Sequence, residues 1–178
     1  EGTEPAFDEG DPKNIAWAST DSADNLGAAF NTVGSMNFWW ADGGWNQLGN
    51  PELDYADVRY TIIATENGGA EWQAQCSIQN VDIDIEEGQT YDISVKISTS
   101  ADLERFTVKL CEQTNDDNTL LYNGKLSVEK GENIVQFANI KKESGSFTTA
   151  KFFVDLGGIP VGTEVKISDI IVQKHKLK

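Results

Sequence analysis

Polar and apolar side chains alternate most clearly between residues 68 and 85 of the chain. Two glycines precede the run EWQAQCSI, in which every second residue is polar. Such alternation is typical of a strand with one buried and one solvated face. The apolar positions then change from even numbers at Ile78 to odd numbers at Val81, which a regular strand does not allow. The pattern predicts a β-bulge near Gln79 and Asn80 that passes the strand from one sheet to the other.

The chain beyond residue 58 is a regular succession of short alternating runs separated by turn signals. One of these signals, Asn123-Gly124, favours a β-hairpin. With two shorter runs nearer the start, about eleven strands are expected and no amphipathic helix. The expected strands cover residues 15–19, 26–31, 58–65, 72–85, 90–98, 105–113, 120–122, 126–128, 133–140, 149–157 and 163–173.

A second change of phase lies in the last expected strand, where the apolar positions change from 165 and 167 to 170 and 172. This change predicts a bulge around Ser168 and Asp169, where the acid is either a solvated charge or a cation ligand. Many short strands without a βαβ pattern predict an all-β fold, an antiparallel β-sandwich. The two phase changes suit a jelly roll.

The length of 178 residues is enough to bury a core, and one β-sandwich domain over 1–178 is the simplest interpretation. Residues 1–14 are acidic and are expected to be a leader that becomes ordered only near Phe7. Because the sequence does not begin with methionine, it is interpreted as a mature or excised piece. No apolar run approaches the roughly 20 residues that span a bilayer.

The net charge of −15 comes from 29 acidic and 14 basic residues. Such a field repels phosphate backbones and anionic lipids, so neither nucleic acid nor a membrane is expected as a partner. Cys76 and Cys111 are too few to define a disulfide framework, and they are interpreted as buried free thiols or as a bridge between neighbouring strands. The only histidine, His175, lies in the basic tail, so a metal or nucleophile site with these cysteines has no support.

Three of the five tryptophans, Trp39, Trp40 and Trp45, lie close together in a segment with several turn signals. Two adjacent residues on a strand point to opposite faces, so at least one of these tryptophans is expected to be exposed. The segment is interpreted either as a loop over an open end of the core or as a platform for a ligand.

The strand that begins after Trp72 carries side chains suited to sugars. An indole ring offers a flat apolar face to the C–H side of a pyranose. Glutamine side chains donate to and accept from hydroxyl groups. Trp72, Gln73 and Gln75 are therefore candidate carbohydrate-binding residues.

Several sequence elements occur in an order that resembles a known family. Gly69, Trp72 and Gln75 are followed by EEGQTYDISVKIS, FANI, AKFFVDLGG and VKISDIIVQK. In this order they resemble the carbohydrate-binding modules of the family 4/9 group, over residues 58–174. The beginning of the chain, Phe7-Asp8 followed by Trp17, is similar to the family's opening F-E…W.

The resemblance implies a jelly roll with a groove across the concave face of one sheet. Such grooves bind single β-glycan chains without cleaving them, and xylan is the expected ligand, with β-glucan next. Trp72 would stack on a sugar ring, and Gln75 would hydrogen-bond to hydroxyls from the groove floor.

The second aromatic residue of the family has no counterpart in the segment CEQTND. Glu112 and Gln113 are candidates for hydrogen bonds at that place instead. A second ring would come from Trp40, Trp45 or Tyr122.

The resemblance also implies a structural calcium ion (Ca2+) away from the groove, with Asp169 and Asp8 as ligands. It implies a monomeric domain of a bacterial protein. That protein would be secreted, periplasmic or on the cell surface. Such a domain targets an attached glycoside hydrolase to polysaccharide. The negative net charge would disfavour uronate-rich or sulfated chains.

Two other functions are open. A glycoside hydrolase on the same scaffold needs two carboxylates about 5 to 10 Å apart across the groove, and Glu71 and Glu112 are its candidates. A structural or protein-binding domain of a secreted protein would instead keep the aromatic segment covered by a neighbouring domain.

Overall fold

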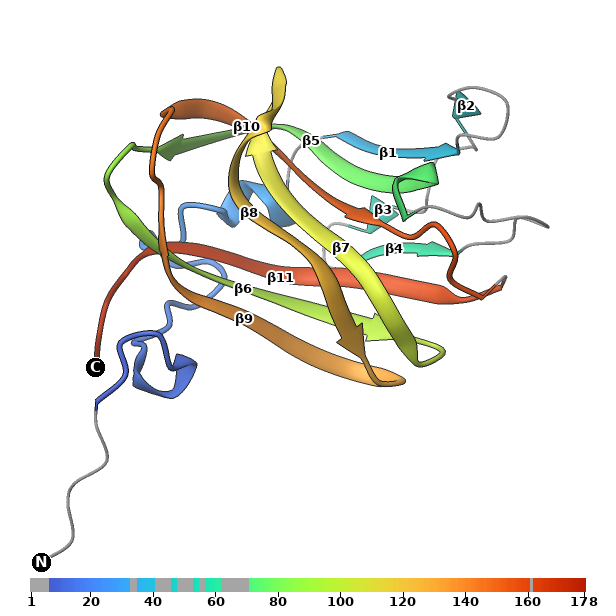
Figure 1. Cartoon of the computed structure of the whole chain (residues 1–178), viewed down its shortest axis with the longest axis horizontal. Coiled ribbons are helices and arrows are strands. Elements are labelled where there is room, and N and C mark those ends of the chain that lie inside the picture. Colours follow the sequence, from blue (N-terminus) through green and yellow to red (C-terminus); the bar gives the residue numbers. More distant parts are fainter. Residues whose placement is uncertain are drawn as a thin grey trace, which may run out of the picture.

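The computed structural model describes residues 7–32, 35–40, 46–47, 53–54, 57–61, 71–160 and 162–178. Its strands form two antiparallel sheets packed face to face (Figure 1). The predicted fold class, an all-β sandwich of the jelly-roll type, is confirmed. The strands are β1 (Ser35–Trp40), β2 (Asn46–Gln47), β3 (Leu53–Asp54), β4 (Asp57–Thr61), β5 (Ala74–Ile85), β6 (Thr90–Thr99), β7 (Leu103–Glu112), β8 (Asn115–Val128), β9 (Gly131–Lys141), β10 (Phe147–Asp155) and β11 (Glu164–Lys174).

Within the described residues, one sheet has six strands in the order β2-β1-β5-β10-β7-β8, and the other has five in the order β3-β4-β11-β6-β9. The alternating apolar positions of the two sheets meet in one core, in which Ile93, Phe106 and Phe152 are almost completely buried. Burial of alternate side chains leaves each sheet with one face toward the core and one face outward. The outward faces are therefore the places where the sandwich can present a binding site.

Two of the predicted strands are wrong, because residues 15–19 and 26–31 do not form ladders. Ile15 makes one isolated bridge to Leu177, and Ala28–Asn31 form a 3-10 turn, η2. The Asn25 amide bends the chain here: its oxygen accepts from the backbone N–H groups of Gly27 and Val172 at 3.0 and 2.9 Å. An Asx-type bond of this kind favours a turn over an extended strand.

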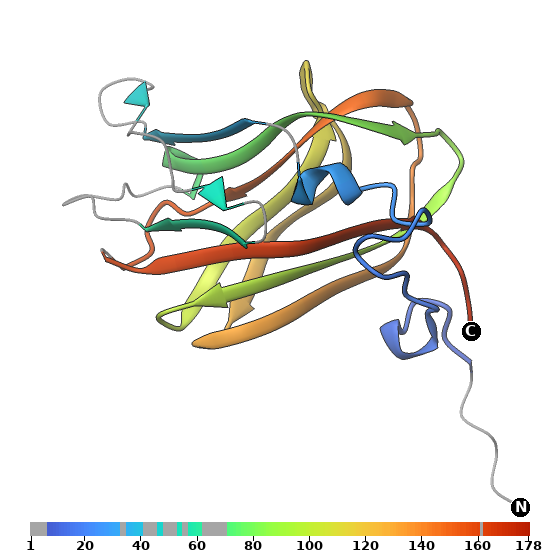
Figure 2. The same cartoon turned by 180° about the vertical axis from the view of Figure 1, so that it is seen from behind.

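The turn η2 closes one edge of the sandwich between β5 and β11 (Figure 2). Its Phe30 is buried and packs edge to face on Phe152, with ring centroids 6.0 Å apart. Two further 3-10 turns are η1 (Pro12–Asn14) and η3 (Glu71–Gln73). No helix within the described ranges is long and apolar enough to cross a membrane.

Both predicted bulges occur. Asn80 has φ 60°, and the pairing of β5 with β10 shifts beside it. Asp169 has φ 50°, and the pairing of β11 with β6 shifts between Ser168 and Ile171. Aspartate and asparagine tolerate this left-handed backbone conformation better than most residues.

The first bulge does not move its strand between sheets, so that part of the prediction is wrong. β5 pairs with β10 on both sides of Asn80 and stays in the six-stranded sheet. The Gln113 side chain, from the end of β7, accepts a hydrogen bond from the Asn80 backbone N–H at 2.8 Å. The bulge changes which residues face the core while the strand continues along the same neighbour.

The predicted hairpin at Asn123-Gly124 is also wrong. Both residues lie inside β8, and the pairing with β7 shifts near them instead. The tight connection lies earlier, between Glu112 and Asn115. Cys76 and Cys111 are buried and form no disulfide, and burial raises the pKa of Cys76 well above its usual value and that of Cys111 to about 11.

Candidate functional site

The outer face of the six-stranded sheet carries two rows of side chains that cross neighbouring strands. On β10, Phe152 and Val154 belong to the core, so Phe153 and Asp155 point outward. The pairing registers place outward residues of β5, β7 and β8 beside them. The first row, the Asp155 row, comprises Gln75, Asp155 and Thr107, and the second, the Phe153 row, comprises Ser77, Phe153, Lys109 and Tyr122.

The Asp155 row is polar and yet deeply buried. Asp155 is only 7% exposed and Thr107 only 2%. The Gln75 side chain forms a hydrogen bond with the Asp155 carboxylate. The Oδ1 atom of that carboxylate is buried with no hydrogen-bond partner among the described residues. A buried oxygen without a partner is costly, so its retention on an outer face marks this row as a candidate binding site.

Burial raises the pKa of Asp155 to about 6, because a charged carboxylate loses hydration inside the protein. The Gln75 hydrogen bond and the positive charge of Lys109 lower the pKa, but they do not offset the burial. The negative charges of Glu71 and Asp116 raise it further. Asp155 is therefore poised to change charge in weakly acidic solution.

Trp72 stands at the end of this row on the short turn η3. Its neighbour Glu71 fixes the turn in two directions: the carboxylate lies 2.7 Å from the Arg105 guanidinium, and the backbone oxygen accepts from the Gly157 N–H at 2.8 Å. The Trp72 side chain is 49% exposed. An anchored backbone with a half-exposed indole is suited to stacking on a flat ligand, because little freedom remains to be lost.

The Phe153 row is covered by lysines. The Lys109 ammonium lies 5.3 Å from the ring centroids of both Phe153 and Tyr122, and the Lys151 ammonium lies 5.9 Å from Phe153. Lys151 also pairs with Asp116 at 2.5 Å. These cation–π contacts explain how a phenylalanine on an outer face is almost fully buried.

Tyr122 is the predicted second ring that the structure places on this face. It is 64% exposed and is paired in register with Lys109. Three strand spacings, or about 14 Å, separate β5 from β8. Trp72 lies just before β5, beyond the Asp155 row, whereas Tyr122 on β8 is the last member of the Phe153 row.

Glu112 and Gln113 lie at the other end of β7, about five residues or roughly 17 Å beyond Thr107. The Glu112 carboxylate accepts from the Asn118 amide at 3.1 Å, and Gln113 holds the β5 bulge. The structure does not bring these two residues together with Trp72, and their hydrogen bonds lie at the ends of the strands.

Three predicted residues fall outside the described side chains. Trp45 lies outside the described residues altogether, and for Trp40 and Gln73 only the backbone is described. In that backbone, Trp40 pairs with Ala74 and its neighbour Trp39 pairs with Gln75. The aromatic strand β1 therefore borders the Asp155 row in the sheet.

The two predicted calcium ligands have other contacts. Asp169 forms an ion pair with Lys96 at 3.1 Å, and Asp8 accepts from the Gly10 N–H at 2.9 Å. The described part of the chain contains no group of three His, Cys, Asp or Glu side chains that could hold a metal ion. The described donors alone do not form a calcium site, and the calcium ion stays a prediction.

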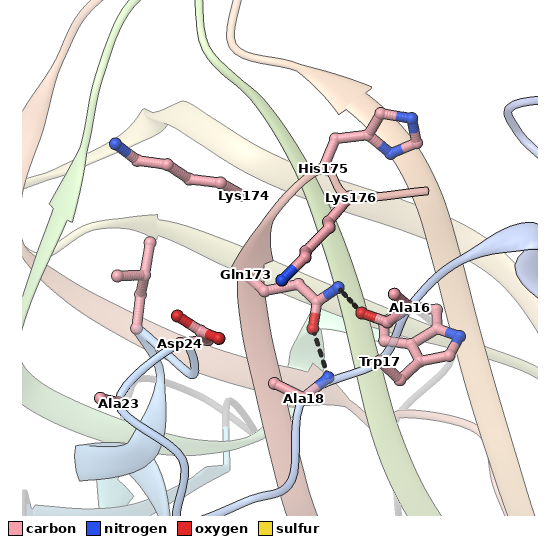
Figure 3. Close-up of a pocket in the computed structure, with 10 residues that line it drawn as sticks. Ala16, Trp17, Ala18, Ala23, Asp24, Gln173, Lys174, His175 and Lys176 are labelled. Carbon is pink, nitrogen blue, oxygen red and sulfur yellow. Dashed lines mark hydrogen bonds between the residues drawn. The ribbon is translucent and has the colours of Figure 1, made fainter. Parts of the chain in front are cut away.

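A separate cavity of about 380 Å³ lies where the chain from Ala16 to Leu26 passes the end of β11 (Figure 3). Several of its polar groups form hydrogen bonds within the protein. The Gln173 amide donates to the Ala16 oxygen and accepts from the Ala18 N–H, and the His175 Nδ1 lies 2.7 Å from the buried Asp92 (Figure 3 shows the glutamine bonds). The buried His175 Nε2 atom has no hydrogen-bond partner among the described residues.

Sequence reasoning missed Asp155 and Lys109. Both lie on the outward side of strands whose inward side is strongly apolar, in FFVDL and TVKLC. The strand parity alone places them outward. Their nearness to Gln75 and Trp72 depends on the order β5-β10-β7, which the sequence does not show.

The sequence matches no protein-family model and no curated protein. The fold, in contrast, is similar to solved structures. One, described as "CBM4 structure and function", has a TM-score of 0.58 and 17% identity, and covers 86% of this chain and 91% of its own. This chain has a CBM4-like fold.

A second structure with this fold is the second N-terminal cellulose-binding domain of β-1,4-glucanase C from Cellulomonas fimi. It has a TM-score of 0.53 and 18% identity, and the match covers 88% of this chain and 98% of that domain. At such low identity the likeness concerns the fold. The CBM4-like fold agrees with the family that the sequence elements resemble.

Proposed function

We propose that the protein is a non-catalytic carbohydrate-binding module that binds single β-glycan chains on the outer face of the six-stranded sheet. The observation that carries the proposal is a half-exposed, anchored tryptophan beside a row of buried polar side chains with an unused acceptor. The cellulose-binding domain with the same fold supports this class of ligand. Xylan is the first expected ligand and β-glucan the second.

In this proposal Trp72 and Tyr122 provide the stacking surfaces. The apolar C–H side of a sugar ring lies on each aromatic ring, and the polar rows between them bond to the hydroxyls. Gln75 is the principal polar contact because it is the least buried member of the Asp155 row. Lys109 lies between Phe153 and Tyr122 and can donate to a hydroxyl or to a ring oxygen.

Binding through one or two stacks and a few hydrogen bonds is expected to be weak, on the order of micromolar to millimolar. The net charge of −15 does not oppose a neutral polysaccharide, but it disfavours uronate-rich or sulfated chains. A neutral glycan therefore fits the proposal better than an acidic one.

The first test is the Trp72→Ala variant, measured by calorimetry or affinity electrophoresis on soluble xylan, mixed-linkage β-glucan and mannan. Loss of the ring is expected to weaken binding about 5- to 150-fold, since stacking of one aromatic ring contributes roughly 1 to 3 kcal/mol. Ile134→Ala is the matched control, because Ile134 is a large apolar residue, 65% exposed, on the five-stranded sheet. Equal binding by Trp72→Ala and the unchanged protein would rule out this face.

One observation favours a second function, glycoside hydrolysis. Asp155 has a pKa raised to about 6, and the nearby Glu71 contributes to that rise. In glycoside hydrolases a raised pKa lets one carboxyl group act as the general acid while the second carboxylate stays ionised. Against it, Asp155 is buried and Glu71 is held by Arg105. Release of reducing sugar that Asp155→Asn abolishes would establish hydrolysis; its absence over a panel of glycans supports the binding module.

The surroundings of such a module form part of the proposal. We expect a monomeric domain of a larger glycoside hydrolase that acts outside the bacterial cell, with a calcium ion at Asp169. A protein-binding sandwich domain is the remaining alternative. It predicts that no glycan changes the tryptophan fluorescence.

A further inference from the structure

The direction of the hydrogen bond between Gln75 and Asp155 determines which end of the Gln75 amide is available to a ligand. A glutamine amide carries an acceptor oxygen at one end and two donor hydrogens at the other. An ionised carboxylate only accepts hydrogen bonds. While Asp155 is ionised, the Gln75 amide must therefore donate to it, and the Gln75 oxygen remains available for other partners.

Protonation removes this constraint. A neutral carboxylic acid has one O–H donor, so it can donate to the Gln75 oxygen. The amide is then free to turn and to present its NH₂ group instead. The bond to a neutral acid is also weaker than the bond to a carboxylate, so the side chain is held less firmly.

We propose that Asp155 is a positioning residue for Gln75, so that glycan binding on this face depends on whether the Asp155 carboxylate carries a proton. The inference rests on the proposed carbohydrate-binding function. It assigns to this chain a response to weak acid that the fold alone does not imply.

Three observations carry the inference. Asp155 and Gln75 are direct cross-strand partners on β10 and β5, and a side-chain hydrogen bond joins them. The Asp155 side chain is more than nine-tenths buried, and its Oδ1 has no partner among the described residues. Trp72 is tied to the same place, because Gly157, two residues beyond Asp155, donates to the backbone oxygen of Glu71.

The charges around Asp155 determine where it titrates. Glu71 on η3 and Asp116 on β8 favour the protonated form, while Lys109 on β7 favours the ionised form. Two cations partly neutralise these acids: Arg105 forms an ion pair with Glu71, and Lys151 on β10 forms one with Asp116. Burial outweighs these groups and brings the pKa to about 6.

The expected binding curve follows from these states. Above pH 7 the carboxylate holds Gln75 in one orientation, so a hydroxyl donor of the sugar meets a fixed acceptor. Below pH 5 both orientations occur, and part of the binding free energy is spent on ordering the amide. We expect the affinity for soluble xylan or β-glucan to fall about three- to tenfold between pH 7.5 and pH 5, which is the contribution of one hydrogen bond.

The test measures the dissociation constant by calorimetry at several pH values from 5 to 8 for the unchanged protein, Asp155→Asn and Asp116→Asn. Asp155→Asn keeps the shape of the side chain but cannot titrate, so its affinity is expected to be flat over this range. Asp116→Asn is the matched control, since Asp116 lies nearby but is exposed, and it is expected to keep the dependence on pH.

The outcomes separate this inference from the proposed function. If the unchanged protein binds a glycan but its affinity does not vary with pH, or varies equally in Asp155→Asn, the positioning role is wrong and the binding module stands. If it binds no glycan of the panel at any pH, the proposed function itself fails. Circular dichroism at each pH confirms that the variants remain folded.

Discussion

The two outer faces of the sandwich treat charge in opposite ways. On the five-stranded sheet, Lys96 lies 3.1 Å from Asp169 and 3.6 Å from Glu132, and all three remain partly exposed to water. On the six-stranded sheet, Asp155 is buried, and one of its oxygens lacks a partner among the described residues. The first arrangement costs little, whereas the second lowers stability at neutral pH.

The difference indicates where the protein gives up stability for another purpose. A fold selected only for stability would place a hydrophobic or neutral polar residue at position 155, as it does at the neighbouring inward positions. Local arrangements that cost free energy concentrate at functional sites. The six-stranded face is therefore the stronger candidate for binding, independently of the fold comparison.

The largest expected effect is on the stability of Asp155→Asn. The pKa of Asp155 is raised to about 6 from an ordinary value of 3.8, so the folded protein holds this proton more tightly than the unfolded chain. Stability is therefore lost as the pH rises from about 4 to about 6, by roughly 2 to 3 kcal/mol. Asparagine avoids this loss, and urea unfolding at pH 7.5 should show a gain of about that size, with almost none at pH 4.

The matched substitution on the other face is Asp169→Asn. Asparagine suits the positive φ of position 169, and only an exposed ion pair is lost. Its unfolding free energy is expected to change by less than about 0.5 kcal/mol. Equal effects of the two substitutions would contradict the contrast between the faces.

The next effect concerns Tyr122→Ala. Tyr122 is 64% exposed on β8, so its removal should leave the unfolding free energy unchanged within about 0.5 kcal/mol. Glycan affinity is expected to fall about five- to tenfold, since one stacking contact is worth about 1 kcal/mol. Calorimetry on xylan checks this, and full affinity in Tyr122→Ala would confine the site to the surroundings of Trp72.

A smaller effect is expected from Lys109→Met. Lys109 lowers the pKa of Asp155, so its loss should raise that pKa further. The midpoint of the pH dependence of binding should then move to a higher pH, by less than about one unit. Titration of the Asp155 carboxyl by NMR measures the shift directly, and Lys125→Met on the exposed part of β8 provides the control. A midpoint that moves downward would show that other charges dominate.

The smallest effect is expected from Lys96→Met on the five-stranded face. An exposed ion pair contributes at most about 1 kcal/mol, so the melting temperature should fall only slightly and the difference should shrink at high salt. If calcium binds at Asp169, removal of the competing lysine should enlarge the stabilisation that added calcium produces. Melting curves with calcium and with a chelator measure this stabilisation. An equal calcium effect in Lys96→Met and the unchanged protein would contradict a calcium site at Asp169.

The sequence predicted the sandwich and both bulges because parity is a local property. The phase changes at Asn80 and Asp169 are visible from the apolar residues on either side. The turn at Asn25 was mistaken for the gap between two strands, because its side-chain bonds to Val172 and Ile170 reach a strand far along the chain. The glycines and asparagines of β8 suggested a turn, but pairing with β7 keeps them extended.

The site was only partly predictable. Trp72 and Gln75 were found from their side-chain chemistry, and Tyr122 was one of three candidates for the second ring. Asp155 was read as part of a hydrophobic strand, since its burial arises from neighbours on β5 and β7 that are remote in sequence. Glu112 and Gln113 lie at the end of β7 remote from Trp72, and this placement depends on the register of β7 with β10, which the sequence does not show.

The bulge of β5 has a consequence for folding. Its geometry is held by Gln113, which belongs to the connection between β7 and β8, while β10, which pairs with both β5 and β7, comes later in the chain. The hairpin of β7 and β8 joins neighbours in sequence and can form early, whereas the pairing of β5 with β10 must wait for β10. During refolding, secondary structure should therefore appear before the glycan binding proposed for this face.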